Sequence, residues 1–239
     1  MTSTPFHRTL PGSLGTLSAQ GPYPLDPFSG ERLKGLHEVY SGSPREGVAA
    51  EGFALGLAMK NAGTLVWLHH DRGHHEIGSP SGGGLHEWGL NVEDLILVRV
   101  PDASALLSGG EDALRSGMAG AVLMSGWGEA RVFTLTASRR LALAAAQGST
   151  AAIVVRADAD PRPSAAHTRW LVRTAPSRPL EAQAPGPPAF RVRLLRSRTG
   201  STGEWIMEWD REKRSFVEQK ASGSLVSVPA GRATGVRAA

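Results

Sequence analysis

The sequence predicts an α/β fold in which a mostly parallel sheet carries helices on both faces and is extended by antiparallel strands near the C-terminus. Three observations predict this fold. Short apolar runs alternate with longer helix-like stretches, as in βαβ units. The runs are nearly continuous in apolar residues, as expected when helices cover both faces of a sheet. After residue 165, strand-like runs follow one another with Pro- and Gly-rich turns and no helix between them.

The parallel strands are expected at the five apolar runs of the first part of the chain. These runs are His37–Ser41, Thr64–His69, Leu95–Val100, Gly120–Ser125 and Ala151–Arg156. Helices are expected between them, at Val48–Asn61, Asp102–Gly117 and Thr136–Gln147.

Four residues suit the ends of these helices. Asp102 and Thr136 can cap the N-termini of the second and third helices, because a short polar side chain accepts a hydrogen bond from a free amide of the first turn. Gly63 and Gly148 follow the first and third helices and suit left-handed C-terminal caps.

The chain as a whole divides into an N-terminal arm, a core and a C-terminal tail. Residues 1–32 are rich in Pro and Gly without periodicity, which indicates an extended arm. Residues 33–210 form the core, and 211–239, with few large apolar residues, is expected to be a flexible basic tail. Within the core, antiparallel strands are expected at His167–Thr174, Phe190–Arg198 and Glu204–Asp210.

Composition excludes several classes of protein. The 239 residues include no cysteine, which rules out disulfides, thiolate metal sites and a cysteine nucleophile. The N-terminus lacks a secretory pattern, and no apolar run approaches the roughly 18 residues that span a bilayer, so a cytoplasmic protein is expected.

Charge is unevenly distributed along the chain. Residues 1–155 hold 11 basic and 14 acidic residues, net −3, whereas residues 156–239 hold 15 and 8, net +7. This asymmetry is compatible with an anionic partner such as nucleic acid.

The segment Gly42–Ala49 lies between the first strand and the first helix, where a phosphate-binding loop would be. Gly42 and Gly47 have the spacing of the pattern G-x-x-x-x-G-K-[ST], but Val48 and Ala49 occupy the lysine and hydroxyl positions. Valine and alanine can neither reach the β- and γ-phosphates nor ligate magnesium. An ordinary strand–helix turn would account for the same two glycines.

The magnesium-binding acid is also missing. In ATPases with this loop, a later buried strand ends in an acid, but the strand ending at Ser125 carries no charge there. Both departures indicate a degenerate loop and no hydrolysis.

A histidine-rich segment, His69–Glu76, could in principle hold zinc or nickel. Gly73 interrupts it, so helical spacing is not secured, and we expect a solvated loop without metal.

A group of arginines and tryptophans could bind single-stranded DNA or a protein. Arginine would contact phosphate and indole would stack on bases. The strand alternation places Arg191 and Arg193 on the opposite face from Phe190, Val192 and Leu194. A solvated sheet face with ordinary cross-strand pairs to Glu204 and Glu208 is therefore an equal alternative. The candidate residues are Arg191, Arg193, Arg196, Arg198, Trp205 and Trp209.

The order of elements resembles RecA. The segment Thr64–Asp71 resembles the second core strand running into the catalytic-acid position, and Ala113–Ser125 resembles the helix and strand of the second magnesium motif. More narrowly, four segments are similar to the ImuA family, the RecA-like accessory proteins of the bacterial damage-induced mutagenesis cassette. They are Gly35–Tyr40, Leu135–Ala146, Phe190–Arg198 and Trp205–Asp210, and the similarity covers roughly residues 33–210.

This resemblance implies a non-enzymatic role in SOS-induced, error-prone translesion DNA synthesis. It implies that the protein binds ImuB, a catalytically inert Y-family polymerase relative. Further candidate binding partners are RecA, an error-prone C-family polymerase and single-stranded DNA. No cofactor and no catalytic residue are expected. Asp71 falls near the place of the RecA-type catalytic glutamate, but without a phosphate site it has nothing to activate.

Two other functions stay open from the sequence. One is a nucleotide-binding or weakly active RecA-type ATPase. The other is a SulA-like inhibitor of cell division, which is disfavoured because that family is shorter and lacks the long basic C-terminal portion.

Overall fold

One mixed sheet organises the protein. The computed structural model describes residues 32–198 and 202–219, and the strands within these residues form a sheet in the order β3-β2-β4-β5-β1-β6-β7-β8-β9. The strands are β1 (Gly35–Ser41), β2 (Leu65–His70), β3 (Leu95–Val100), β4 (Ala121–Trp127), β5 (Ala151–Ala157), β6 (Thr168–Thr174), β7 (Ala189–Ser197), β8 (Gly203–Asp210) and β9 (Ser215–Glu218). The first six are parallel, and β7, β8 and β9 are antiparallel.

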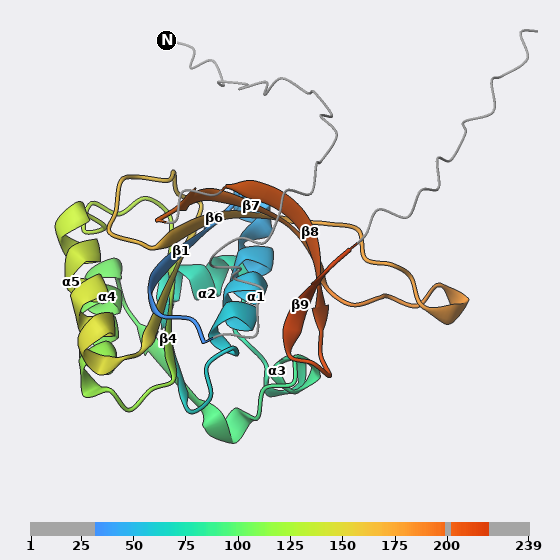
Figure 1. Cartoon of the computed structure of the whole chain (residues 1–239), viewed down its shortest axis with the longest axis horizontal. Helices are drawn as coiled ribbons and strands as arrows, with labels where there is room; N and C mark the ends of the chain where they lie inside the picture. Colours follow the sequence, from blue (N-terminus) through green and yellow to red (C-terminus); the bar gives the residue numbers. More distant parts are fainter. Residues whose placement is uncertain (1–31, 199–201, 220–239) are drawn as a thin grey trace, which may run out of the picture.

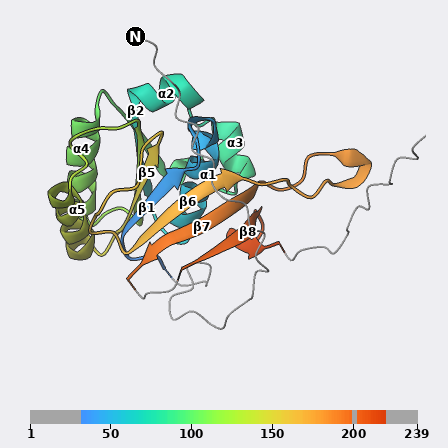
Figure 2. The ribbon, with the colours of Figure 1, turned by 90° about the horizontal axis from the view of Figure 1, so that it is seen from above.

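Helices cover both faces of the parallel part. The α-helices are α1 (Gly47–Ala58), α2 (Asp71–Ile77), α3 (Gly82–Glu87), α4 (Ala103–Ser116) and α5 (Leu135–Gly148), and short 3-10 turns lie at Pro44–Glu46, Val92–Asp94 and Glu181–Gln183. Helix α1 packs on one face and α4 with α5 on the other, and β6–β8 arch over α1 (Figure 1). The view from above shows α4 and α5 on one side of β1 and β5, and α1 on the other (Figure 2). The predicted α/β fold with a C-terminal antiparallel extension is confirmed.

Of the two predicted N-terminal helix caps, one is confirmed and one is wrong. Asp102 accepts hydrogen bonds from the amides of Ser104 and Ala105, both at 2.8 Å, so its capping role is confirmed. Thr136 was the wrong choice for α5. The helix begins at Leu135, and Thr134 accepts the hydrogen bond of the Ala137 amide at 3.1 Å.

The two glycines expected as C-terminal caps have other roles. Helix α1 ends at Ala58, before Gly63, whose left-handed φ of 99° lies in the turn into β2. In α5 the left-handed residue is Ser149, with a φ of 50°. Gly148 is required for close packing, because a Cβ there would lie 2.0 Å from the Leu114 carbonyl oxygen of α4. Both cap predictions are therefore wrong.

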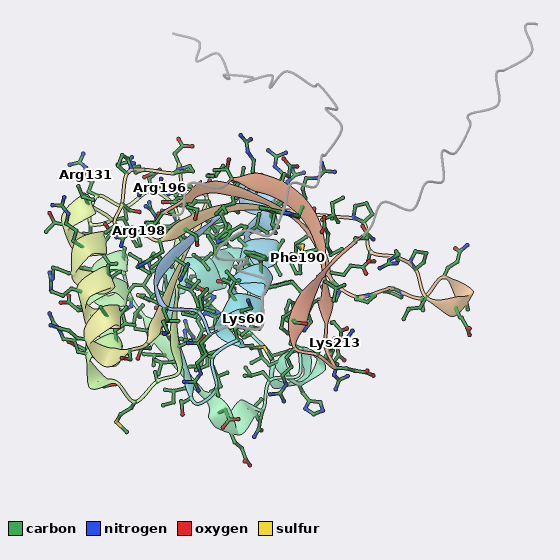
Figure 3. All side chains as sticks on the ribbon, viewed as in Figure 1. Lys60, Arg131, Phe190, Arg196, Arg198 and Lys213 are labelled. Atoms are coloured by element: carbon green, nitrogen blue, oxygen red, sulfur yellow. The ribbon has the colours of Figure 1, made fainter. Side chains whose placement is uncertain are left out.

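Strand β7 alternates as its sequence predicts. Phe190, Val192 and Leu194 are buried, whereas Arg191 and Arg193 are exposed. Figure 3 shows Phe190 beneath the arch, and Arg196 and Arg198 toward the end of the strand near α5. The strand thus has one face in the core and one in solvent.

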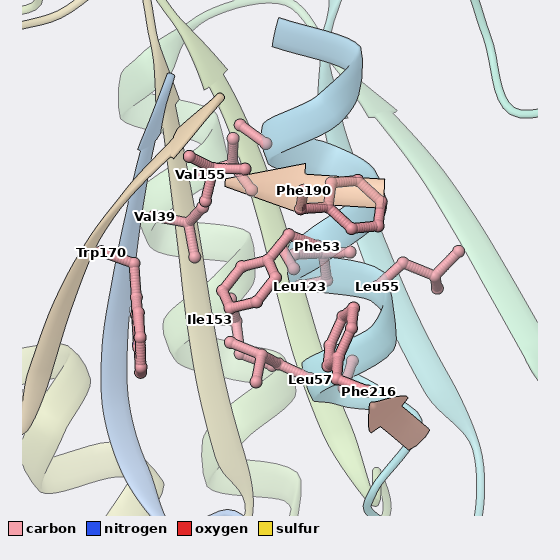
Figure 4. Packing of buried hydrophobic residues seen from close by; sticks show 14 of the residues in the cluster. Val39, Phe53, Leu55, Leu57, Leu123, Ile153, Val155, Trp170, Phe190 and Phe216 are labelled. Carbon is pink, nitrogen blue, oxygen red and sulfur yellow. The ribbon is translucent and has the colours of Figure 1, made fainter. Parts of the chain in front are cut away.

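The core on the α1 side is built around Phe53. Its ring lies 4.9 Å from Phe216, 5.5 Å from Trp170 and 6.3 Å from Phe190, measured between ring centroids (Figure 4). These partners come from β9, β6 and β7, so a single helical side chain joins three strands that are distant in sequence.

The C-terminal boundary of the core lies further along the chain than the sequence indicates. The predicted tail began at residue 211, but β9 pairs with β8 and Phe216 is buried. The aromatic contact with Phe53 explains why this segment is ordered. Residues 1–31, the greater part of the predicted arm, and 220–239, the rest of the predicted tail, lie outside the described residues.

Within the described part of the chain, every helix is too short or too polar to cross a bilayer.

His37, at the start of β1, is held in its neutral form by a buried network. Its Nε2 lies 2.9 Å from the Lys34 carbonyl oxygen, which can only accept, so Nε2 carries the proton. Its Nδ1 then accepts from the Thr168 hydroxyl at 2.7 Å, and that hydroxyl oxygen accepts from the Trp170 indole at 2.9 Å. Burial is the main cause that lowers the pKa of His37 from 6.5 to about 4.

We predict that substituting Phe216 by alanine lowers the free energy of unfolding by about 3 kcal/mol, because it leaves a cavity against Phe53. Chemical denaturation measures this loss. The neighbouring Val217→Ala variant is the control: Val217 is 40% exposed, and its truncation should cost less than about 1 kcal/mol. Equal losses of stability in the two variants would contradict the inclusion of β9 in the core.

We predict that His37 makes the fold acid-sensitive. Because the folded pKa lies below the unfolded one, the unfolded chain binds the extra proton first, and stability falls as pH drops from 6.5 to about 4 and then levels off. The loss from this group is up to about 3 kcal/mol. Urea unfolding at pH 7 and pH 4.5 measures it, and His37→Gln should show a smaller drop between the two. An unchanged drop would assign the acid sensitivity to other groups.

Candidate functional site

The carboxyl edge of the parallel strands is where a phosphate site would lie, and its loop is tied to the sheet. The Gly42 amide donates to the Val172 carbonyl oxygen of β6 at 2.8 Å. The Ser43 hydroxyl donates to one Glu46 carboxylate oxygen at 3.0 Å, and the other accepts from the Thr174 amide at 3.3 Å. A carboxylate therefore lies directly before α1, where its negative charge would repel an anion.

The two glycines of the loop serve packing. A Cβ at position 47 would lie 2.7 Å from the Trp127 ring, and one at position 42 would lie 2.4 Å from Cγ of Arg173. Trp127, the last residue of β4, is only 6% exposed and lies against the first turn of α1. Gly42 and Gly47 thus make room for side chains of this protein.

The residues that replace the ATPase signature point in different directions. Val48 is 59% exposed on the surface of α1, while Ala49 is buried in the core. Ser125 is buried, and its hydroxyl oxygen accepts from the Trp67 indole at 2.9 Å. The place of the magnesium-binding acid is therefore part of an aromatic core.

Asp71 follows β2 at the same edge but faces an arginine. The Arg99 guanidinium donates to one Asp71 oxygen at 2.8 and 3.0 Å, and these hydrogen bonds lower the pKa of the carboxyl. The carboxylate is therefore engaged by a neighbouring strand.

The histidine-rich segment is a helix, which corrects the predicted loop. Asp71–Ile77 forms α2, with Gly73 buried on its inner side. His69 and His70 end β2 and are buried, whereas His74 and His75 lie on the helix. His69 contacts Glu51 of α1, with Nε2 3.1 Å from the carboxylate oxygen. Among the described residues, no group of three or more His, Cys, Asp or Glu side chains could hold a metal ion.

The hollow that remains beside the loop is acidic. It has a volume of about 230 Å³ and is lined by Ser41–Pro44 together with Glu129, Asp158, Ala159 and Asp160. Glu129 is ion-paired with Arg162 at 3.0 Å and with Arg156 at 3.6 Å, so its charge is compensated. The carboxylates of Asp158 and Asp160 would repel the phosphates of a nucleotide.

The arginines of β7 belong to a basic surface that β6 completes. Arg173 of β6 stands opposite Arg191, and all three of Arg173, Arg191 and Arg193 are exposed. We call these three residues the arginine face. It lies on the convex side of β6–β8, away from α1, because the intervening residues of β7 are in the core.

Among the described residues, one acid is ion-paired with the arginine face: Glu204 lies 3.5 Å from Arg191 and stands opposite Arg193. The other predicted partner, Glu208, is engaged by Arg178 at 2.7 Å and by Gln219 at 2.8 Å. Because the Arg191–Glu204 ion pair is largely exposed, it contributes little free energy. The arginine face keeps an excess of positive charge.

The other candidate residues do not join this face. Trp209 is 2% exposed and packs on Trp88 and Phe216, and Trp205 lies near Trp170 on the same core side of the sheet. Arg196 and Arg198 donate to the carbonyl oxygens of Ser164 and Ala165 at 2.8 and 2.9 Å. The structure therefore does not bring the tryptophans together with Arg191 and Arg193.

Sequence reasoning missed two residues here, Trp127 and Arg173. Trp127 lies just beyond the predicted strand Gly120–Ser125, and only its three-dimensional contact with Gly47 reveals its role. Arg173 was contained in the predicted strand His167–Thr174, but its position opposite Arg191 depends on the strand register.

Comparisons with known proteins relate this chain to one family by sequence. No protein-family model matches the chain. "Protein ImuA" from two strains of Caulobacter vibrioides is 32% identical over 246 aligned residues, which cover 93% of this chain and 95% of the relative. SulA from Pseudomonas aeruginosa aligns with a TM-score of 0.39 and 21% identity, over 51% of this chain and 97% of SulA.

The fold and its carboxyl edge define an α/β protein in which the position of a phosphate loop is filled by the protein's own side chains. The chain belongs to the ImuA family. This membership supports involvement in the damage-induced mutagenesis cassette.

Proposed function

We propose that this chain is a cytoplasmic, non-enzymatic accessory protein of SOS-induced error-prone translesion synthesis that works by binding other proteins. The observation that carries the proposal is the occupied start of α1, where Trp127 packs against Gly47 and Glu46 places a carboxylate in the loop. A nucleotide would have to displace a packed indole and overcome repulsion from Glu46 and from Asp158 and Asp160 of the hollow.

The partner expected from the family is the ImuB-like inactive Y-family polymerase. RecA, the error-prone C-family polymerase and single-stranded DNA are further candidates. The arginine face is the surface best suited to an acidic partner, because its three guanidinium groups stand on adjacent strands and remain exposed.

We predict negligible ATP hydrolysis, measured as phosphate release with and without single-stranded DNA. The paired substitutions Val48→Lys and Ala49→Thr should not create activity, because Trp127, Glu46 and Ser125 remain in place. Turnover by the unaltered chain of about one per minute, well below the ordinary enzyme range, would overturn the non-enzymatic proposal.

We predict that Arg191→Glu with Arg193→Glu weakens binding to ImuB or to single-stranded DNA while leaving the fold intact, because both side chains are exposed. Binding of the unaltered chain to DNA should weaken as salt rises, with a logarithmic slope near −0.7 per neutralised phosphate. Affinity is measured in titrations at several salt concentrations, with circular dichroism as the check on folding.

The matched control is Arg131→Glu with Arg139→Glu, which changes net charge equally at exposed positions on and before α5. This control should bind nearly as well as the unaltered chain. A folded Arg191/Arg193 variant with full affinity for both partners would place the contact elsewhere on the protein.

A further inference from the structure

Strand β3 forms one end of the sheet and exposes apolar side chains there. It pairs with β2 from Leu65↔Leu95 to His70↔Val100, and among residues 32–198 and 202–219 no strand pairs with its other side. Ile96 is 52% exposed and Leu97 is 41% exposed. Because neighbouring residues of a strand point to opposite faces, the apolar surface extends over both sides of this edge.

The edge lacks the features that ordinarily prevent strand pairing. Its register with β2 has no shift, and the strand contains no proline. Its one charged residue, Arg99, is ion-paired with Asp71 at 2.8 Å, and because its side chain stays 54% exposed, it can also meet a carboxylate of another molecule. Val100 is buried, and Leu95 and Val98 are half-buried against the two core clusters, so Ile96 and Leu97 are the apolar side chains of the strand that are left exposed. A regular apolar edge of this kind is a template for another strand.

We infer that β3 pairs with β3 of a second copy of this chain, antiparallel about a two-fold axis near Ile96 and Leu97. In such a self-complementary interface, the exposed apolar side chains on each face of one copy cover those of the other. A second copy is favoured over an unrelated peptide because it presents matching apolar side chains on both faces at once.

The charges at the two ends of β3 favour the antiparallel arrangement. Glu93 and Asp94 are exposed just before the strand, and Arg99 is exposed near its end. Antiparallel pairing brings Arg99 of each copy toward these carboxylates of the other. Parallel pairing would instead place like charges side by side, which is unfavourable.

The chain lacks cysteine, which makes a direct test of the register available. Single variants Ile96→Cys, Leu97→Cys and Val98→Cys are oxidised mildly at low protein concentration. Near a two-fold axis, one residue faces its own counterpart at about 4.5–5.5 Å between Cα atoms, within disulfide reach. At least one variant should form a disulfide-linked dimer readily, and Met118→Cys, 85% exposed, should not.

Sedimentation equilibrium provides the second measurement. The unaltered chain should dimerise reversibly, and Ile96→Lys with Leu97→Lys should raise the dimer dissociation constant at least about tenfold through like-charge repulsion. Met118→Lys should leave it unchanged. A chain that stays monomeric up to its solubility limit, cross-linking at Met118→Cys as fast as at β3, or a dimer unaffected by the two lysines would overturn the inference.

Discussion

The near-complete burial of helix α1 is the constraint on which the rest of the structure depends. Nine of its twelve residues are buried, and its sequence is apolar all round, apart from Glu51, which contacts His69. A flat parallel sheet can cover only one side of such a helix. The antiparallel strands must therefore curl over the other side, and they do so with aromatic side chains that meet Phe53. Gly56 allows this approach, because a Cβ there would lie 2.4 Å from the Phe216 ring.

The same helix explains the carboxyl edge. A helix buried along its length brings its first turn close to the ends of β4 and β5, and Trp127 occupies the space above that turn. In a phosphate-binding protein the free amides of this turn would meet an anion. Here the indole packs against Gly47 and the Glu46 carboxylate stands directly before the helix, so the architecture of an anion site persists with a negative charge in the anion's place.

The parts of the fold with strong patterns could be predicted from the sequence, and those that depend on contacts could not. The continuous strands and the long helices were visible because each carries a run of apolar residues. Helices α2 and α3 were missed because Gly73 and Gly82–Gly84 lower helix propensity, and packing overrides that preference. Strand β9 was missed because a single aromatic residue, Phe216, secures it.

The site shows the same division. The loss of the lysine, the hydroxyl and the acid could be seen in the chain, because each is a matter of residue type at a position. The alternation on β7 also predicted which arginines are exposed. The inward direction of Trp205 and Trp209 could not be predicted, because it depends on how β8 pairs with β7: Val192, in the core, stands opposite Trp205.

The order of the strands has a consequence for how the protein could engage partners. Strand β3 ends the sheet on one side, while the arginine face lies on β6 and β7 beyond its centre toward the other. The two surfaces are thus separated by β2, β4, β5 and β1 and do not compete for the same space. A two-fold pair joined at β3 would be bivalent, with one basic surface on each outer flank. Two weak contacts to a single extended partner would then be strengthened by effective concentration, without any further contact at either surface.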